Sequence, residues 1–153
     1  GVDVSRIISV RVNGIPAPQG SKRHVGGGRM VESSTAVGPW REAVRAQTQL
    51  VVGDDGPIEG PVDVVLSFYL LRPKGHFGAR GLRPSAPRRP GVKPDLDKLV
   101  RSTLDGLVAG GALEDDARIV GLVASKRYAA KGSPVGMTAD ILPVTPADWG
   151  DDA

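Results

Sequence analysis

The residues of this sequence that are best suited to catalysis are carboxylates in two short segments. The first segment is Lys-Pro-Asp-Leu-Asp-Lys over residues 93–98, and the second is Glu-Asp-Asp over residues 114–116. Mg²⁺ is a hard cation that prefers oxygen ligands, and carboxylates that hold it can place an activated water and a neutralising charge beside a phosphate. The two segments therefore predict a metal-dependent phosphodiester hydrolase if the fold brings Asp95, Asp97 and Asp116 together.

Helix capping is a simpler explanation for one of these acids. Asp95 follows Pro94 and opens an amphipathic segment. Asp is favoured at the N-cap because its carboxylate accepts hydrogen bonds from free backbone N–H groups. This explanation suits Asp95 better than Asp97, which lies two residues further on. The Asp-x-Asp pair alone does not select a reaction, because glycosyltransferases and other phosphohydrolases also use it.

Two cations follow the Asp-x-Asp pair at helical spacing. Lys98 lies three residues after Asp95. Arg101 lies four residues after Asp97, so each cation shares a helix face with an acid. Either cation is a candidate for stabilising the charge on a phosphate during hydrolysis, and an ordinary ion pair within the helix is an equal alternative. Asp105, four residues after Arg101, extends the same stripe.

The distribution of charge predicts a polyanionic partner. The net charge is only +3, but residues 72–101 hold nine Lys and Arg against two Asp. Such a concentration of bases favours nucleic acid, because each phosphate that is neutralised releases condensed counterions. The alternative is a solvated surface loop in a protein from a GC-rich genome. The bases that we expect to contact a nucleic-acid backbone are Lys22, Arg23, Arg88, Arg89, Lys93, Lys126 and Arg127.

Composition excludes several classes of protein. With no Cys and only two His, the chain has no disulfide, no catalytic thiol and no Cys- or His-rich metal site. No apolar run reaches the roughly 18 residues that a membrane span needs. The N-terminus has no signal-peptide pattern, so we expect a cytoplasmic protein without a membrane partner. The length of 153 residues suits a single domain over residues 1–153, with a flexible acidic tail over residues 146–153.

Hydrophobic periodicity predicts strands and helices in a mixed order. The strands are expected near residues 8–12, 61–72, 119–128 and 137–141, and the helices over residues 40–52 and 95–109. Gly (21) and Pro (13) are abundant, and they concentrate in two predicted long loops, residues 14–38 and 73–94. This order predicts an α+β fold in which a mixed sheet of about four strands packs against two helices.

Three further expectations concern packing. The strand over residues 61–72 is apolar on both faces, which is typical of the middle of a covered sheet. The turn over residues 130–134 predicts a hairpin between the last two strands. The side chains expected in the core include Trp40, Ala43, Val44, Ala46 and Leu50 of the first helix, with Phe68, Tyr69 and Leu71 of the strand.

With both acidic segments in view, the sequence resembles the RusA family of Holliday junction resolvases of phages and prophages. The matching core runs over residues 93–107 and continues over residues 113–120. The segment 16–23, Pro-Ala-Pro-Gln-Gly-Ser-Lys-Arg, and the Pro-Trp-Arg helix start at residues 39–41 are also similar to phage members. The likeness extends from residue 8 to about residue 142.

The resemblance implies a role for each acid of the two segments. Asp95, Asp97 and Asp116 match the metal-binding catalytic aspartates of the family, and Asp115 is a neighbouring candidate ligand. The catalytic lysine of the family falls on Arg101, which is a departure from the family pattern. Arg keeps the positive charge but does not readily donate a proton. Lys98 stands where Asn is common in the family and is the compensating candidate.

The resemblance also implies partners and a reaction. The expected protein is a homodimer that depends on Mg²⁺, or on Mn²⁺ as a substitute, and nicks opposed strands of a four-way DNA junction during recombination and repair. Two alternatives are a non-catalytic nucleic-acid-binding protein with the same fold and a metal-dependent nucleotide hydrolase. An intact set of three Asp argues against the first, and the spread of bases over three segments argues against the second.

Overall fold

A computed structural model describes residues 5–20, 22–25, 29–32 and 35–145 of the chain. Its centre is a four-stranded sheet with the order β1–β8–β4–β7. The strands are β1 (Ile8–Asn13), β4 (Val62–Leu70), β7 (Ile119–Tyr128) and β8 (Gly136–Pro143). β8 is antiparallel to both neighbours, whereas β4 and β7 are parallel. The predicted α+β fold with a mixed sheet of four strands and two helices is confirmed.

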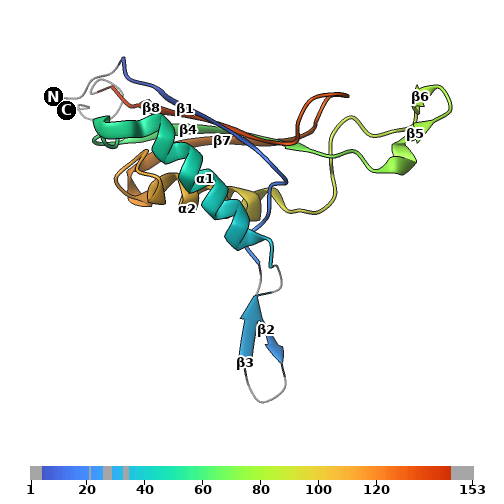
Figure 1. Cartoon of the computed structure of the whole chain (residues 1–153), viewed down its shortest axis with the longest axis horizontal. Helices are drawn as coiled ribbons and strands as arrows, with labels where there is room; N and C mark the ends of the chain where they lie inside the picture. The colour runs from blue at the N-terminus through green and yellow to red at the C-terminus, as the bar shows by residue number, and fades with distance from the viewer. Residues whose placement is uncertain (1–4, 21, 26–28, 33–34, 146–153) are drawn as a thin grey trace, which may run out of the picture.

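The two helices are α1 (Val37–Val52) and α2 (Leu96–Ala109), and they pack against each other on one side of the sheet (Figure 1). α2 lies between β4 and β7 in the chain, which gives the parallel pair the helical crossover that it requires. None of the helices in the described part of the chain is long and apolar enough to cross a bilayer.

The core lies between the sheet and this helical layer. Alternate residues of β1 and β4 are buried, as their period of two predicts. Phe68, Leu99 and Leu107 are fully buried at its centre. Trp40 packs here as predicted, and its indole N–H donates a hydrogen bond of 3.1 Å to Thr103 Oγ1. The core therefore fixes α2 from both the sheet and α1.

The predicted hairpin between the last two strands is wrong. β7 and β8 are not neighbours, because β4 lies between them and pairs with both. The strand β4 takes an interior position in the sheet, as predicted. A strand that is apolar on both faces buries more apolar surface there than a strand with one polar face would. Its second face is not covered by a helix, and Val65 on that face is 37% exposed.

Four core assignments are corrected by the helix and strand geometry. The buried residues of α1 are Val37, Trp40, Val44, Thr48 and Val52, at spacings of three and four. Leu50 is 77% exposed, because it lies about 200° around the helix from Thr48. Ala43 and Ala46 are exposed too, and Leu71, just beyond β4, is 78% exposed.

The two predicted loops contain short hairpins. Within residues 14–38, β2 (Lys22–Val25) pairs with β3 (Arg29–Glu32), and α1 begins at Val37 rather than at residue 40. Within residues 73–94, β5 (Phe77–Gly78) pairs with β6 (Gly81–Leu82). This second segment projects from one end of the molecule (Figure 1) and is called the arm below. The predicted acidic tail lies outside the described residues.

Candidate active site

The acidic segment 93–98 lies at the N-terminus of α2. Asp95 occupies the N-cap position, but its carboxylate makes no capping hydrogen bond. Asp95 Oδ2 lies 3.9 Å from Lys98 Nζ, one turn along the helix. The simple capping role considered for Asp95 is therefore not realised.

Close packing against α1 fixes the position of α2. A Cβ atom added to Gly106 would lie 2.7 Å from Val44 Cβ, and one added to Gly110 would lie 2.5 Å from Thr48 Cβ. Only glycine leaves room for such an approach. Together with the buried Leu99, these contacts place the exposed face of α2 at a defined distance from α1.

The segment before the β2–β3 hairpin is bound to the same helix. Ser102 Oγ donates a hydrogen bond of 2.6 Å to the carbonyl oxygen of Ala17, and the backbone N–H of Gln19 donates one of 3.0 Å to the carbonyl oxygen of Lys98. The Gln19 side chain is thereby placed beside α2. Sequence reasoning did not single out Gln19, although it lies within the segment 16–23 that resembles the family.

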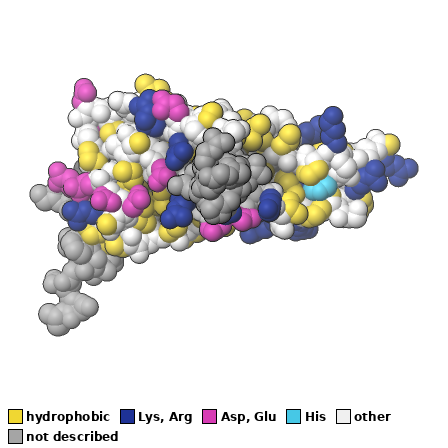
Figure 2. Space-filling model, turned by 90° about the horizontal axis from the view of Figure 1, so that it is seen from below, with side chains coloured by type: hydrophobic (Ala, Val, Ile, Leu, Met, Phe, Trp, Pro, Cys, Tyr) yellow, Lys and Arg dark blue, Asp and Glu magenta, His cyan; other side chains and the backbone are white. Residues whose placement is uncertain are grey.

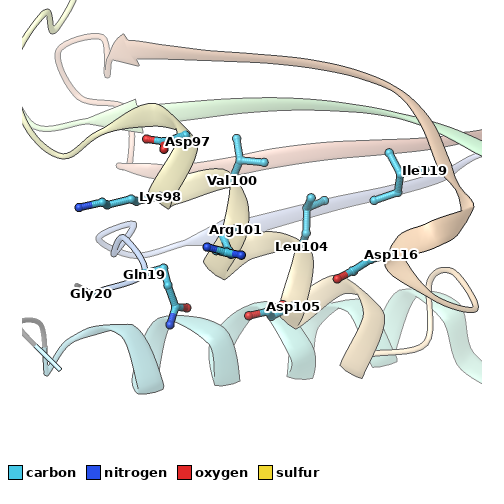
Figure 3. Close-up of a pocket in the computed structure, with 10 residues that line it drawn as sticks. All are labelled: Gln19, Gly20, Asp97, Lys98, Val100, Arg101, Leu104, Asp105, Asp116 and Ile119. Atoms are coloured by element: carbon cyan, nitrogen blue, oxygen red, sulfur yellow. The ribbon is translucent and has the colours of Figure 1, made fainter. Parts of the chain in front are cut away.

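A cavity of about 610 Å³ opens where these elements meet (Figure 3). Asp97, Arg101 and Asp105 line it at four-residue spacing along α2. Asp116 reaches it from a 3-10 turn, η4 (Asp116–Arg118), that precedes β7. The complete lining is Gln19, Gly20, Asp97, Lys98, Val100, Arg101, Leu104, Asp105, Asp116 and Ile119. The two acidic segments therefore reach one cavity although about twenty residues separate them.

Three charged side chains of the cavity are available to a ligand. Asp97, Arg101 and Asp116 are exposed, and none of them makes a hydrogen bond or ion pair with another residue in the described ranges. Asp105 differs, since its Oδ2 lies 3.8 Å from Arg41 Nη1 of α1. The stripe of acid, base and acid along α2 thus ends in an ion pair between helices.

The donor atoms suit a hard cation, although the carboxylates are not gathered around one point. Among the residues that the structure describes, no three acidic, His or Cys side chains lie close enough to hold a metal ion. Asp116 points toward α2, whereas the Asp97 carboxylate, which is on α2, is directed away from Asp116 (Figure 3). Asp95 is not part of the lining. Asp115 Oδ1 accepts a hydrogen bond of 3.1 Å from the N–H of Ala117 and so caps η4.

The bases predicted to contact DNA lie in different surroundings. Lys126 Nζ donates hydrogen bonds of 2.7 Å to the carbonyl oxygen of Val92 and 3.0 Å to that of Pro94, which is the residue before Asp95. Its neighbour Arg127 is exposed. Arg88, Arg89 and Lys93 are exposed on the arm, and the side chains of Lys22 and Arg23 lie outside the described part.

Comparison with known proteins places this arrangement in one family. The search of curated proteins found no match. The family model for endodeoxyribonuclease RusA matches residues 12–137, which is most of the chain and includes every residue of the cavity lining. The chain therefore belongs to the RusA endodeoxyribonuclease family, whose activity is the nucleolytic resolution of Holliday junctions.

Proposed function

We propose that this protein is a Mg²⁺-dependent resolvase that cuts four-way DNA junctions by paired nicks, in recombination and repair, with Mn²⁺ as a substitute ion. The observation that carries the proposal is the cavity in which Asp97 and Asp116 flank Arg101, all three exposed to solvent. RusA nucleases are divalent-metal dependent, and this cavity offers only oxygen donors among its acidic and polar side chains.

The carboxylates of the cavity are the groups that would hold the ion. Asp97 and Asp116 are its first candidates, followed by Asp95, which lies two residues before Asp97 at the N-cap of α2, and Asp115, one residue before Asp116. A bound divalent cation supplies charge neutralisation and an activated water for phosphodiester hydrolysis.

Arg101 and Lys98 are the candidates for binding the scissile phosphate. The guanidinium of Arg101 lies in the cavity between the two acidic segments (Figure 3). Its planar fork matches two phosphate oxygens. It cannot readily supply a proton, so we assign it to charge stabilisation. Lys98 also lines the cavity and lies beside Asp95.

Paired nicks need two active sites, and β7 offers a surface on which two copies can meet. β7 is an edge strand of ten residues in the described sheet, with Val120, Leu122 and Val123 exposed by 59%, 46% and 65%. An apolar edge with unpaired backbone groups favours pairing with another strand. We therefore propose a homodimer through this edge. Sedimentation of the protein and of Val123→Lys tests it, and an unchanged dimer in the variant would place the interface elsewhere.

The function is tested on a labelled four-way junction, a matched duplex and a single strand. Each substrate is incubated with the protein in Mg²⁺ and, separately, in EDTA. We expect symmetric nicks on the junction in Mg²⁺ alone. Binding of the junction without cleavage in Mg²⁺ or Mn²⁺ would favour a binding protein, and Arg101→Lys is then the variant that restores the family residue. Turnover of mononucleotides without any effect on DNA would indicate a nucleotide hydrolase.

A further inference from the structure

The arm, residues 73–94, is the most strongly basic surface of the described chain. It contains six Lys and Arg and no Asp or Glu. Of its residues only Pro90 is buried, so these side chains face solvent. Lys and Arg side chains gather at the end of the molecule from which the arm projects, and no acidic side chain is visible there (Figure 2). The arm lies outside the lining of the carboxylate cavity.

A second cavity, of about 510 Å³, lies between the arm and the turn that follows β7. Phe77 and Leu82 are directly opposed partners in the β5–β6 hairpin, and both line this cavity. They are 40% and 51% exposed, and Leu71 in the same lining is 78% exposed. Tyr128, Arg72 and Lys131 complete a wall that combines apolar, aromatic and cationic groups. We call this cavity the arm groove.

The groove is preformed because one arginine fixes the arm to the sheet. The guanidinium carbon of Arg72 lies 4.3 Å from the centre of the Tyr128 ring. Arg72 Nη1 also donates a hydrogen bond of 2.7 Å to the carbonyl oxygen of Pro87 and lies 3.2 Å from His76 Nδ1. The His76 ring meets Tyr128 edge-on, with ring centres 5.4 Å apart. The two walls of the groove are therefore joined through contacts between arm and β7.

We propose that the arm groove binds an unpaired base of branched DNA while the arm's Lys and Arg contact the flanking phosphates. This inference rests on the proposed function and adds a second DNA-binding surface to the carboxylate cavity. Base rings stack on aromatic and apolar side chains and on guanidinium planes, and phosphates are attracted to the surrounding bases. In a duplex the bases are stacked and paired, so only a branch point or a single strand presents one to the groove.

Charge favours DNA over another protein as the occupant. A second copy of this chain would bring the same acid-free basic arm to the interface, and like charges without counterions repel. A polyanion instead neutralises the arm. The volume of the groove lies within the range of about 300–1,000 Å³ that is usual for small-ligand sites, so one planar base fits it.

The test compares Phe77→Ala and Leu82→Ala with Leu50→Ala, which removes an exposed apolar side chain of α1 that lies outside the groove. Junctions carrying 2-aminopurine at the branch point report stacking by fluorescence, and titrations give the affinity for the junction and for a matched duplex. For the two groove variants we expect about tenfold weaker junction binding, unchanged duplex binding and loss of the fluorescence change. Leu50→Ala should behave as the wild type.

Three results would overturn the inference, and they differ from one another. If the wild type binds and cuts the junction but Phe77→Ala matches it in affinity and fluorescence, the groove is not a DNA site and the proposed function stands. If Phe77→Ala changes the oligomeric state in sedimentation without altering the affinity of the protein for DNA, the occupant is a second copy. If the wild type itself neither binds nor cuts DNA, the proposed function fails as well.

Discussion

The carboxylate cavity and the arm are built in opposite ways. The cavity lies on α2, whose other face is buried against the core through Leu99 and Leu107, and whose glycines allow α1 to approach closely. The arm buries only Pro90, and the contacts that hold it include those of Arg72 and of Lys126. One surface is thus supported by the whole fold, and the other by a few local interactions.

This difference matches the demands of the two tasks. A catalytic group must stay within a fraction of an ångström of its productive position, so it belongs on a packed element. A surface that follows a flexible polyanion needs charge and reach more than precision, so an exposed segment serves. Substitutions in the two regions should therefore have separable effects on cleavage and on binding.

The largest effect is expected for a carboxylate of the cavity. Asp97→Asn keeps the size of the side chain but removes the negative charge that a cation needs. Loss of a residue that only hydrogen-bonds to a metal ligand lowers metal affinity or activity by about 10- to 100-fold. Loss of a ligand itself should have a larger effect, so we expect the cleavage rate to fall by more than about a hundredfold. Junction binding in EDTA should persist. Asp54→Asn, an exposed acid in the turn after α1, is the control. A folded Asp97→Asn protein that no longer binds DNA would contradict the division between the two regions.

The support beneath the cavity is tested by Gly106→Ala. The added Cβ would lie 2.7 Å from Val44 Cβ and 3.0 Å from the Arg41 carbonyl oxygen, so α1 must move. We expect a loss of about 1–3 kcal/mol in the free energy of unfolding, measured by urea denaturation. Gly38→Ala in α1, where nothing lies within 4 Å of the new Cβ, should be neutral or stabilising. Equal effects of the two changes would show that the α1–α2 contact is not tight.

Lys126 lies where the two regions meet, since it binds the carbonyls of Val92 and Pro94 at the end of the arm, just before α2. Lys126→Met removes these two hydrogen bonds and should lower the cleavage rate by about tenfold. It should also raise the Mg²⁺ concentration that is needed for half-maximal cleavage. The affinity for the junction should not change. Arg127→Met, on the adjacent exposed side chain, should weaken binding instead. Hydrogen exchange of the amides of residues 95–98 without metal should increase in Lys126→Met alone. Weaker binding in both variants would mean that Lys126 contacts DNA.

The smallest effect is expected for an ion pair that belongs to neither region. A hydrogen bond from Arg45 lowers the pKa of Glu42 below its ordinary value of 4.5, and the two side chains are 36% (Arg45) and 62% (Glu42) exposed. A lowered carboxyl pKa adds stability above the ordinary value, and this stability is lost as the pH falls through the lowered pKa. Arg45→Met should return the Glu42 pKa to its ordinary value in an NMR titration, with cleavage and junction affinity unchanged. A change in either would connect this pair to the site.

The local elements and the chemical groups could be predicted from the amino-acid sequence alone. Periodicity predicted β4, α2 and β7 nearly to the residue, because the period of apolar side chains follows directly from strand and helix geometry. The two acidic segments were recognisable because closely spaced carboxylates beside Lys and Arg suit a hard cation at a phosphate. Even Trp40 was placed correctly, since a large apolar side chain beside a helix start has few alternatives to the core.

Which elements meet could not be predicted in this way, because it depends on the tertiary packing. β4 separates β7 from β8 because strand order depends on which apolar strand gains most from an interior position, and a local turn cannot reveal this. The same holds for side chains. Lys126 binds backbone carbonyls rather than solvent, and Asp97 and Asp116 share a cavity that does not include Asp95. Spacing along the chain gives a helix face, whereas contacts between distant segments depend on the packing of the whole core.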